Sequence, residues 1–229
     1  MVSRRIAAIR FFRPIGALFF LFLCTSGCGF GGGQMLYALG FGRTQKVKAE
    51  IKLTENPILI LVDDDNDRVH WPPAKRYLAD EVAQELLRHK AAKQIIPQET
   101  IEALRQAHPD FDKRGCREVG EMAGAEQVVW IQIQDFFAEE DFLDATEAAF
   151  VQATVKVINV LEKEQRMHVR IWPTGSSGSA VTASLTGAHV VQLKKKDAIC
   201  EELTRELAEK IAKFFYDHRL GDFEKPPGG

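Results

Sequence analysis

The chain has 229 residues, of which 45% are hydrophobic and 27% are charged, and its formal net charge is −2. This composition is typical of a globular protein and excludes a disordered chain, a collagen-like repeat and a polytopic membrane protein. The slightly negative charge also argues against a nucleic-acid-binding protein, because such proteins carry an excess of Lys and Arg.

The first residues of the chain have the organisation of a secretory signal. Four arginines and no acidic residue fall within the first 13 positions, and the apolar run 15–23 follows them. That run is shorter than the ~20 residues that a membrane-spanning helix requires. A basic segment, a short apolar segment and small residues before a cleavage point therefore predict a signal peptide over residues 1–27.

The end of this signal resembles the lipobox of bacterial lipoproteins. Ser26 and Gly27 precede Cys28 as small residues do in that motif, whereas Thr25 stands where the family usually has Leu. The resemblance implies cleavage between Gly27 and Cys28, a diacylglycerol on the Cys28 thiol and an acyl chain on the new amine. Several acyl chains together hold a protein stably on a bilayer. The alternative is that Cys28 is an ordinary cysteine of a signal peptide.

The charge of the processed chain bears on its location and partners. Removal of residues 1–27 removes four arginines and leaves a net charge of −6. An acidic domain has no overall attraction to nucleic acid or anionic lipid, so membrane lipid is expected as a partner only through Cys28. We expect no cofactor apart from this covalent lipid. Gly29 stands where some inner-membrane lipoproteins have Asp, which favours the outer membrane, with the domain facing the periplasm.

A tether, one domain and a short tail are expected after the signal. Residues 29–45 contain six glycines, which predicts a flexible tether between Cys28 and a globular domain over residues 46–221. Residues 222–229 predict a disordered tail.

The domain begins with two predicted strands. Residues 47–53 alternate strictly between apolar and charged side chains, which predicts a half-buried edge strand that could accept a partner's strand. Residues 58–62 are continuously apolar, as in a strand that is covered on both faces.

Helices and further strands follow in alternation. The two prolines at 72–73 predict a helix start, and the expected apolar stripe of that helix is Leu78, Ala79, Val82, Ala83, Leu86 and Leu87. The remaining expected elements are a short strand at 94–97, helices at 98–106 and 116–123, strands at 127–136, 149–160, 167–172 and 180–185, and a closing helix from about 195 to 220. They predict a single α/β (α+β) domain: a mixed β-sheet with helices packed on it and a long C-terminal helix.

Part of this domain resembles the periplasmic α/β domain of the curli-secretion lipoprotein family and the TolB amino-terminal domain. The resemblance is carried by residues 79–104 and 120–133, where Gly124, Ala125 and Glu126 end a helix and lead into an apolar strand. It implies a non-enzymatic role in envelope assembly, secretion or scaffolding. The connection 137–148 is too short for a membrane-spanning hairpin, so a pore is not expected.

The acidic run after the first buried strand is the sharpest candidate for chemistry. Asp63, Asp65 and Asp67 resemble the start of a calcium loop, and clustered carboxylates can hold Mg²⁺ or Ca²⁺. Arg68 and Ala74, however, occupy the positions where the turn glycine and the bidentate glutamate would stand. A solvated acidic loop is the favoured interpretation, and a cation site is the alternative.

Cysteine and histidine spacing suggests neither a metal site nor a nucleophile. Cys116 and Cys200 remain after processing, and they could pair outside the cytoplasm. Their placement on separate predicted helices favours two buried free thiols instead.

Two functions remain open on the sequence. The first is a lipid-anchored, non-enzymatic envelope module that binds a partner protein or a second copy of itself, with no catalytic residue. The second is a metal-dependent hydrolase that uses Asp63, Asp65 and Asp67.

Overall fold

The computed structural model describes residues 46–64, 67–138, 147–161, 170–174 and 177–219. By its internal contacts the chain divides into residues 1–45 and residues 46–229, and every described residue belongs to the second unit. The predicted lipidation site at Gly27 and Cys28, and Asp65 of the acidic run, therefore lie outside the described residues.

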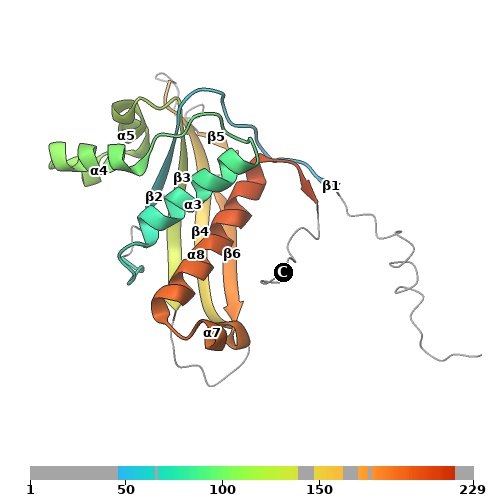
Figure 1. Cartoon of the computed structure of the whole chain (residues 1–229). Helices are drawn as coiled ribbons and strands as arrows, with labels where there is room; N and C mark the ends of the chain where they lie inside the picture. Colours follow the sequence, from blue (N-terminus) through green and yellow to red (C-terminus); the bar gives the residue numbers. More distant parts are fainter. Residues whose placement is uncertain (1–45, 65–66, 139–146, 162–169, 175–176, 220–229) are drawn as a thin grey trace, which may run out of the picture. The chain divides into compact units, whose positions relative to one another are not determined.

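Five strands form a mixed sheet, which Figure 1 shows face-on. They are β2 (Ile58–Asp63), β3 (Gln127–Ala138), β4 (Glu147–Asn159), β5 (Arg170–Trp172) and β6 (Ser179–Thr186). β2 pairs in parallel with β3, which pairs antiparallel with β4. β5 and β6 both pair antiparallel with β4, along different parts of its length. The predicted mixed sheet of a single α/β domain is confirmed.

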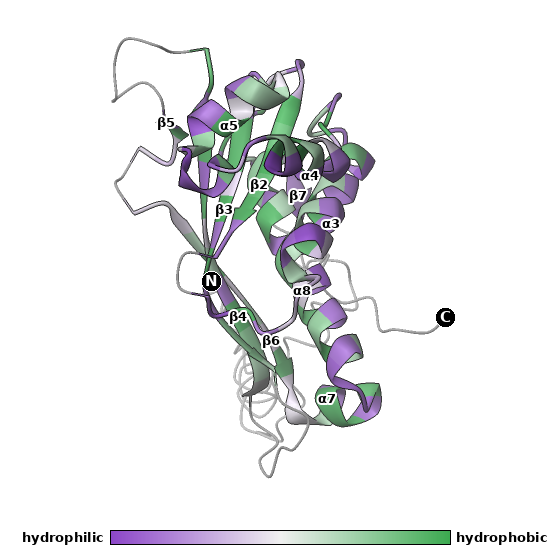
Figure 2. Ribbon diagram, turned by 90° about the vertical axis from the view of Figure 1, so that its left-hand side faces the viewer, coloured by the Kyte–Doolittle hydropathy of each residue, from purple (hydrophilic) through white to green (hydrophobic). Residues whose placement is uncertain are grey.

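Helices cover the two faces of this sheet unequally. α3 (Ala74–Arg88) and α8 (Lys196–Ala212) pack on one face, with α7 (Gly187–Leu193) just before α8. α4 (Gln98–Ala107), the short 3₁₀ turn η1 (Phe111–Lys113) and α5 (Cys116–Ala123) contribute to a second, smaller core on the other face. Figure 2 shows α7 at the lower end of the sheet and α8 rising from it along the sheet, while α4 and α5 lie near the upper end.

The apolar periodicity of α3 explains how it packs. Leu78, Val82 and Leu86 recur every four residues and are fully buried against the sheet and α8. Leu87, which the sequence places on the same stripe, is 47% exposed. It lies one residue past Leu86, so the helix turns its side chain away from the core.

The connection from α5 to β3 has the form that the sequence predicts. Gly124 ends α5 in the left-handed conformation, with φ of 74°, and Ala125 N donates to the Gly120 carbonyl. Glu126 N then donates to the Pro57 carbonyl, which sets the parallel register of β3 beside β2.

Two predicted strands are wrong in detail. Of the expected strand 47–53 only Val47 lies in a strand, β1 (Lys46–Val47), which pairs with β7 (His218–Arg219) rather than with the main sheet. Its apolar residues Ile51 and Leu53 pack on the core from an irregular segment. The expected strand 94–97 is reduced to one parallel bridge between Ile95 and Ile58.

The closing helix is shorter than predicted. α8 ends at Ala212, a 3₁₀ turn η2 (Lys213–Phe215) follows, and the chain then extends into β7. The turn places both Phe214 and Phe215 against Trp172, with ring centroids 5.0 Å and 6.1 Å apart. None of the described helices combines the length and the apolar character needed to cross a bilayer.

Candidate functional site

The acidic run begins where β2 ends, and the carboxylates of Asp63 and Asp64 accept hydrogen bonds within the domain. Asp63 Oδ2 accepts a hydrogen bond of 3.1 Å from the indole Nε1 of Trp130 on β3. Asp64 accepts from the backbone amides of Arg68 and Val69, at 3.1 Å and 2.9 Å, and so closes the turn that follows the strand. Asp67 is exposed and has a φ of 50°.

Asp65 lies outside the described residues, so the cation site of Asp63, Asp65 and Asp67 stays a prediction. Within the described ranges, no three His, Cys, Asp or Glu side chains lie close enough together to hold a metal ion. Asp63 and Asp67 both lie at the end of β2, and no described His, Cys, Asp or Glu completes a group of three with them. Nothing in these residues supports the metal-hydrolase alternative.

A polar cluster that the sequence analysis missed lies beside Asp63 on the sheet. Lys156 of β4 lies over the Trp130 ring, with Nζ 4.7 Å from the ring centroid, and donates to Gln132 Oε1 at 2.8 Å. We name Asp63, Trp130, Gln132 and Lys156 the Trp130 cluster. Trp130 pairs with Lys156, and Gln132 pairs with Thr154, so all of these side chains share one face of the sheet.

The same face continues past the Trp130 cluster as an open surface. Phe137 and Phe150 are direct partners across β3 and β4, and their rings stack with centroids 5.7 Å apart. Phe137 is 38% exposed. The other members of this surface are polar: Gln134, Gln152, Thr154 and Thr182, of which Gln134, Gln152 and Thr182 are exposed. We name these six residues the open face.

The signal for this face was present in the sequence. Within β3 the side chains that alternate with Val129, Ile131 and Ile133 are Trp130, Gln132 and Gln134. The apolar set marks the core side of the strand, and the polar set between them marks the opposite face.

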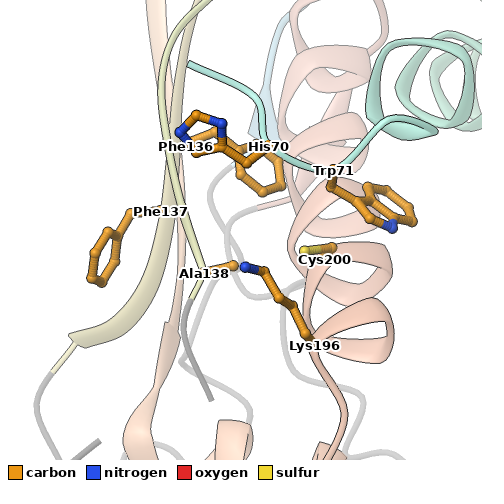
Figure 3. Close-up of a pocket in the computed structure, with 7 residues that line it drawn as sticks. All are labelled: His70, Trp71, Phe136, Phe137, Ala138, Lys196 and Cys200. Atoms are coloured by element: carbon orange, nitrogen blue, oxygen red, sulfur yellow. The ribbon is translucent and has the colours of Figure 1, made fainter. Parts of the chain in front are cut away.

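A small pocket lies on the opposite side of β3, between the end of that strand and α8. Figure 3 shows it, with a volume of 110 Å³ and lining residues His70, Trp71, Phe136, Phe137, Ala138, Lys196 and Cys200. Lys196 extends from the first turn of α8 toward Ala138, whereas Phe137 points away from the pocket. None of these lining residues is acidic.

The cysteine of this pocket is chemically inert at neutral pH. Cys200 is 0% exposed, and burial raises the pKa of its thiol from 9.0 to about 11. Only the thiolate is nucleophilic, so a thiol with this pKa is unreactive near pH 7. Burial also raises the pKa of the Cys116 thiol. Both thiols are free, as the sequence favoured, and they belong to cores on opposite faces of the sheet.

A further group of grooves surrounds the end of α8. Two of them, of 310 and 220 Å³, share His89 and Tyr216, and a third, of 400 Å³, lies between β6 and the β1–β7 ribbon. Glu85 lines the first groove and is only 5% exposed; its carboxylate bonds to Arg88 and lies 3.4 Å from His89 Nε2.

Comparison with known proteins does not assign a family. No family model matches the chain, and no curated protein matches it. The resemblance to the curli-secretion and TolB domains therefore stays a prediction.

Several solved structures align over most of the chain at low identity. The PelC dodecamer from Paraburkholderia phytofirmans is 12% identical over 75% of this chain and 97% of its own, with a TM-score of 0.40. The lipoprotein GNA1162 from Neisseria meningitidis is 11% identical over 69% of this chain and 98% of its own, with a TM-score of 0.41. The hypothetical protein CT253 from Chlamydia trachomatis is 13% identical over 71% and 98%, with a TM-score of 0.37. These likenesses are distant, so the function is argued from the chain's own residues.

Proposed function

We propose that this protein is a lipid-anchored module of the bacterial cell envelope that binds a partner protein, or a second copy of itself, without catalysing a reaction. Acyl chains on Cys28 hold it to the membrane, with the domain on the periplasmic side and the outer membrane favoured over the inner. The lipobox-like residues before Cys28 support the anchor.

The open face is the observation that carries the binding role. Over the part of the sheet nearest α7, helices pack on one side, and the opposite side presents polar side chains around the stacked pair Phe137–Phe150. A solvated sheet face is ordinary in antiparallel proteins, and this one also carries an aromatic pair near the end of β3, of which Phe137 is exposed and Phe150 is partly buried. Aromatic side chains surrounded by polar ones are typical of the centre and rim of a protein interface.

The shape and chemistry of the surface also favour binding over catalysis. The open face is built on paired strands, with hydrogen bonds between its own side chains, such as the 3.5 Å bond from Gln134 Nε2 to Thr154 Oγ1. General acid–base catalysis uses titratable groups held within hydrogen-bond reach of a bound substrate. The six residues of the open face are uncharged, and the register places one carboxylate beside them, that of Asp135 opposite Gln152.

Site-specific photocrosslinking in native membranes tests the binding role. A photoreactive side chain at Gln152, at the centre of the open face, is expected to give discrete adducts with a partner or with a second copy. The matched control is Lys75, which is equally exposed but lies on α3, on the other side of the sheet. Equal adduct patterns from both positions would contradict the proposal.

The anchor is tested separately by mass. The membrane-bound protein is expected to begin at Cys28 and to carry the added mass of a diacylglycerol and an acyl chain. Cys28→Ala should remove that mass and release the domain from the membrane fraction.

A further inference from the structure

Three stretches of chain converge at the end of the domain where the tether joins. They are residues 46–55, 85–93 and 206–219. β1 pairs with β7, the amides of Glu50 and Ile51 donate to the Phe214 carbonyl, and His89 stacks on Tyr216. Figure 1 shows the β1–β7 ribbon beyond the C-terminal end of α8. We name this end of the domain the tether face.

The tether face is basic in a domain that is otherwise acidic. Its three stretches contain nine Lys and Arg against six Asp and Glu, whereas the rest of residues 46–219 contains fifteen against twenty-four. The nine basic residues are Lys46, Lys48, Lys52, Arg88, Lys90, Lys93, Lys210, Lys213 and Arg219. The negative net charge of the whole chain therefore hides a positive end.

Ion pairs account for some of these side chains. Lys46 pairs with Asp217 at 3.0 Å, Lys93 with Glu55 at 2.6 Å and Lys210 with Glu206 at 2.8 Å. Basic residues at the C-terminal ends of α3 and α8 also offset the partial negative charge of those helix ends. That explanation suits Arg88 and Lys213, because each stands at such an end.

Neither these ion pairs nor the charge of the helix ends accounts for Lys48, Lys52 and Lys90. Lys48 and Lys52 are exposed on the irregular segment that follows β1, and Lys90 is exposed on the turn after α3. Lys48 lines the groove beside β6. Lys52 and Lys90 both line a different groove, the one next to Tyr216.

The tether brings this face within reach of the bilayer. Residues 29–45 separate Cys28 from Lys46, and a Gly-rich segment of that length has a root-mean-square span of roughly 20–25 Å. Exposed lysines near an anionic membrane surface are attracted to it within about one Debye length, or about 8 Å at physiological salt. A tether of this reach allows the tether face to touch the headgroups.

We propose that the tether face docks on the anionic phospholipid headgroups of the bilayer that holds the acyl chains, through Lys48, Lys52 and Lys90. This rests on the proposed lipid anchor at Cys28. Docking gives the domain a fixed orientation on the membrane, with the tether face toward the lipid.

The experiment compares lysine reactivity on two kinds of vesicle. The full lipidated protein is reconstituted on phosphatidylcholine vesicles with or without phosphatidylglycerol, and acetylation of each lysine is followed by mass spectrometry. Phosphatidylglycerol is expected to slow acetylation of Lys48, Lys52 and Lys90 severalfold, and high salt should abolish the effect. Lys75 and Lys113, exposed on α3 and η1, are the matched controls and should not change.

The outcomes separate the two proposals. Protein that floats with the vesicles but is acetylated equally on both contradicts the docking inference alone. Protein that carries no lipid and does not float contradicts the anchor, and the inference with it. Equal protection by inorganic phosphate without vesicles would assign the lysines to a soluble anion and would also overturn the inference. Lys93 lines the same groove as Lys52 and Lys90, so phosphatidylglycerol should also slow its acetylation in the parent protein. The variant Lys48→Glu/Lys52→Glu/Lys90→Glu should float normally but lose this protection of Lys93.

Discussion

The imidazole ring of His89 lies flat on the phenol ring of Tyr216, with centroids 3.9 Å apart and an interplanar angle of 5°. His89 is the C-cap of α3, and Tyr216 follows the turn that ends α8. The stack therefore joins the ends of the two helices that cover the main core, and Glu85 beneath it contacts His89 as well.

We expect this stack to contribute measurably to stability. His89→Ala and Tyr216→Ala should each lower the free energy of unfolding, and a double-mutant cycle should give a coupling energy of about 1 kcal/mol. Urea denaturation monitored by circular dichroism gives the free energy of unfolding of the two single variants and of the double variant. A coupling energy near zero would mean that the two rings contribute independently.

Gly120 marks a close approach between α5 and the sheet. A Cβ atom there would lie 2.5 Å from Val128 Cγ2 and 2.7 Å from Val160 Cγ2, which is closer than atoms can pack. Gly120→Ala should therefore destabilise the domain by about 1–3 kcal/mol, despite the better helix propensity of Ala. Thermal unfolding measures the loss.

A second substitution tests whether crowding is the cause. Val128→Ala removes one of the two methyl groups in the way, so the double variant Gly120→Ala/Val128→Ala should lose less stability than the two single losses added together. Gly115→Ala is the space control, because a Cβ there meets nothing within 4 Å. Strict additivity would refute the crowding explanation.

The buried thiol of Cys200 predicts a pH dependence. The pKa of this thiol is raised from 9.0 to about 11 because the charged form is disfavoured in the core. Between these values the unfolded chain loses the thiol proton and the folded chain keeps it, so stability falls as pH rises through this window, by up to about 1.4 kcal/mol per pH unit. Below pH 9 the thiol is protonated in both the folded and the unfolded chain, so this loss of stability does not occur there.

Cys200→Ala should remove the part of the fall in the free energy of unfolding above pH 9 that comes from this thiol. Chemical denaturation at a series of pH values from 8 to 11 compares the two proteins. In the same range, alkylation of Cys200 in the folded protein should be much slower than alkylation after unfolding. Equal slopes of stability against pH in both proteins would contradict the assignment.

The bond between Asp63 and Trp130 predicts a structural rather than a catalytic role for this carboxylate. Asp63→Ala leaves the partly buried indole N–H without its acceptor and should cost about 1 kcal/mol, whereas Asp63→Asn keeps an acceptor oxygen and should cost less. Tryptophan fluorescence during urea unfolding measures both changes. Asp112→Ala, which breaks an exposed pair with Arg105, is the control and should cost less than about 1 kcal/mol.

The same variants test the alternative of a metal site. Asp63→Ala should keep the Gln152 crosslinks of the intact protein, and calorimetry should detect no divalent-cation binding tighter than millimolar. Cation binding that is lost in Asp63→Ala would instead favour the hydrolase hypothesis.

The elements that the sequence predicts well are those whose packing follows from local periodicity. The continuous apolar run 58–62 forms the buried parallel strand β2, and the four-residue spacing of Leu78, Val82 and Leu86 forms the buried stripe of α3. Gly124 also ends α5 in the left-handed conformation that the sequence predicts at this position.

The elements that it predicts poorly depend on long-range contacts. Alternation in residues 47–53 marks side chains that pack on the core, but a strand also needs a partner, and only Val47 and its neighbour find one in β7. The end of α8 is set by the packing of two successive phenylalanines on Trp172, which a continuing helix would turn apart. α7 was missed although Thr186, whose side chain accepts from the amide of His189, is a recognisable N-cap.

The candidate site was predictable only in part. Asp63 drew attention because acidic residues after a buried strand are a recognisable pattern, but its partner Trp130 is 67 residues away and comes from the neighbouring strand. Likewise, Phe137 and Phe150 become a pair only through the register of β3 and β4. Sequence patterns report the period of a strand and not which residue it faces.

The short ribbon of β1 and β7 also determines how the domain would respond to mechanical load. A pull on the chain before Lys46 would act first on this ribbon, in which Lys46 pairs with Arg219, Val47 pairs with His218, and Lys46 forms an ion pair with Asp217. Two antiparallel residue pairs loaded from one end separate one after the other, so this force would detach residues 46–47 before it reached β2. Opening of the ribbon would lengthen the segment that precedes the domain while the main sheet stayed folded.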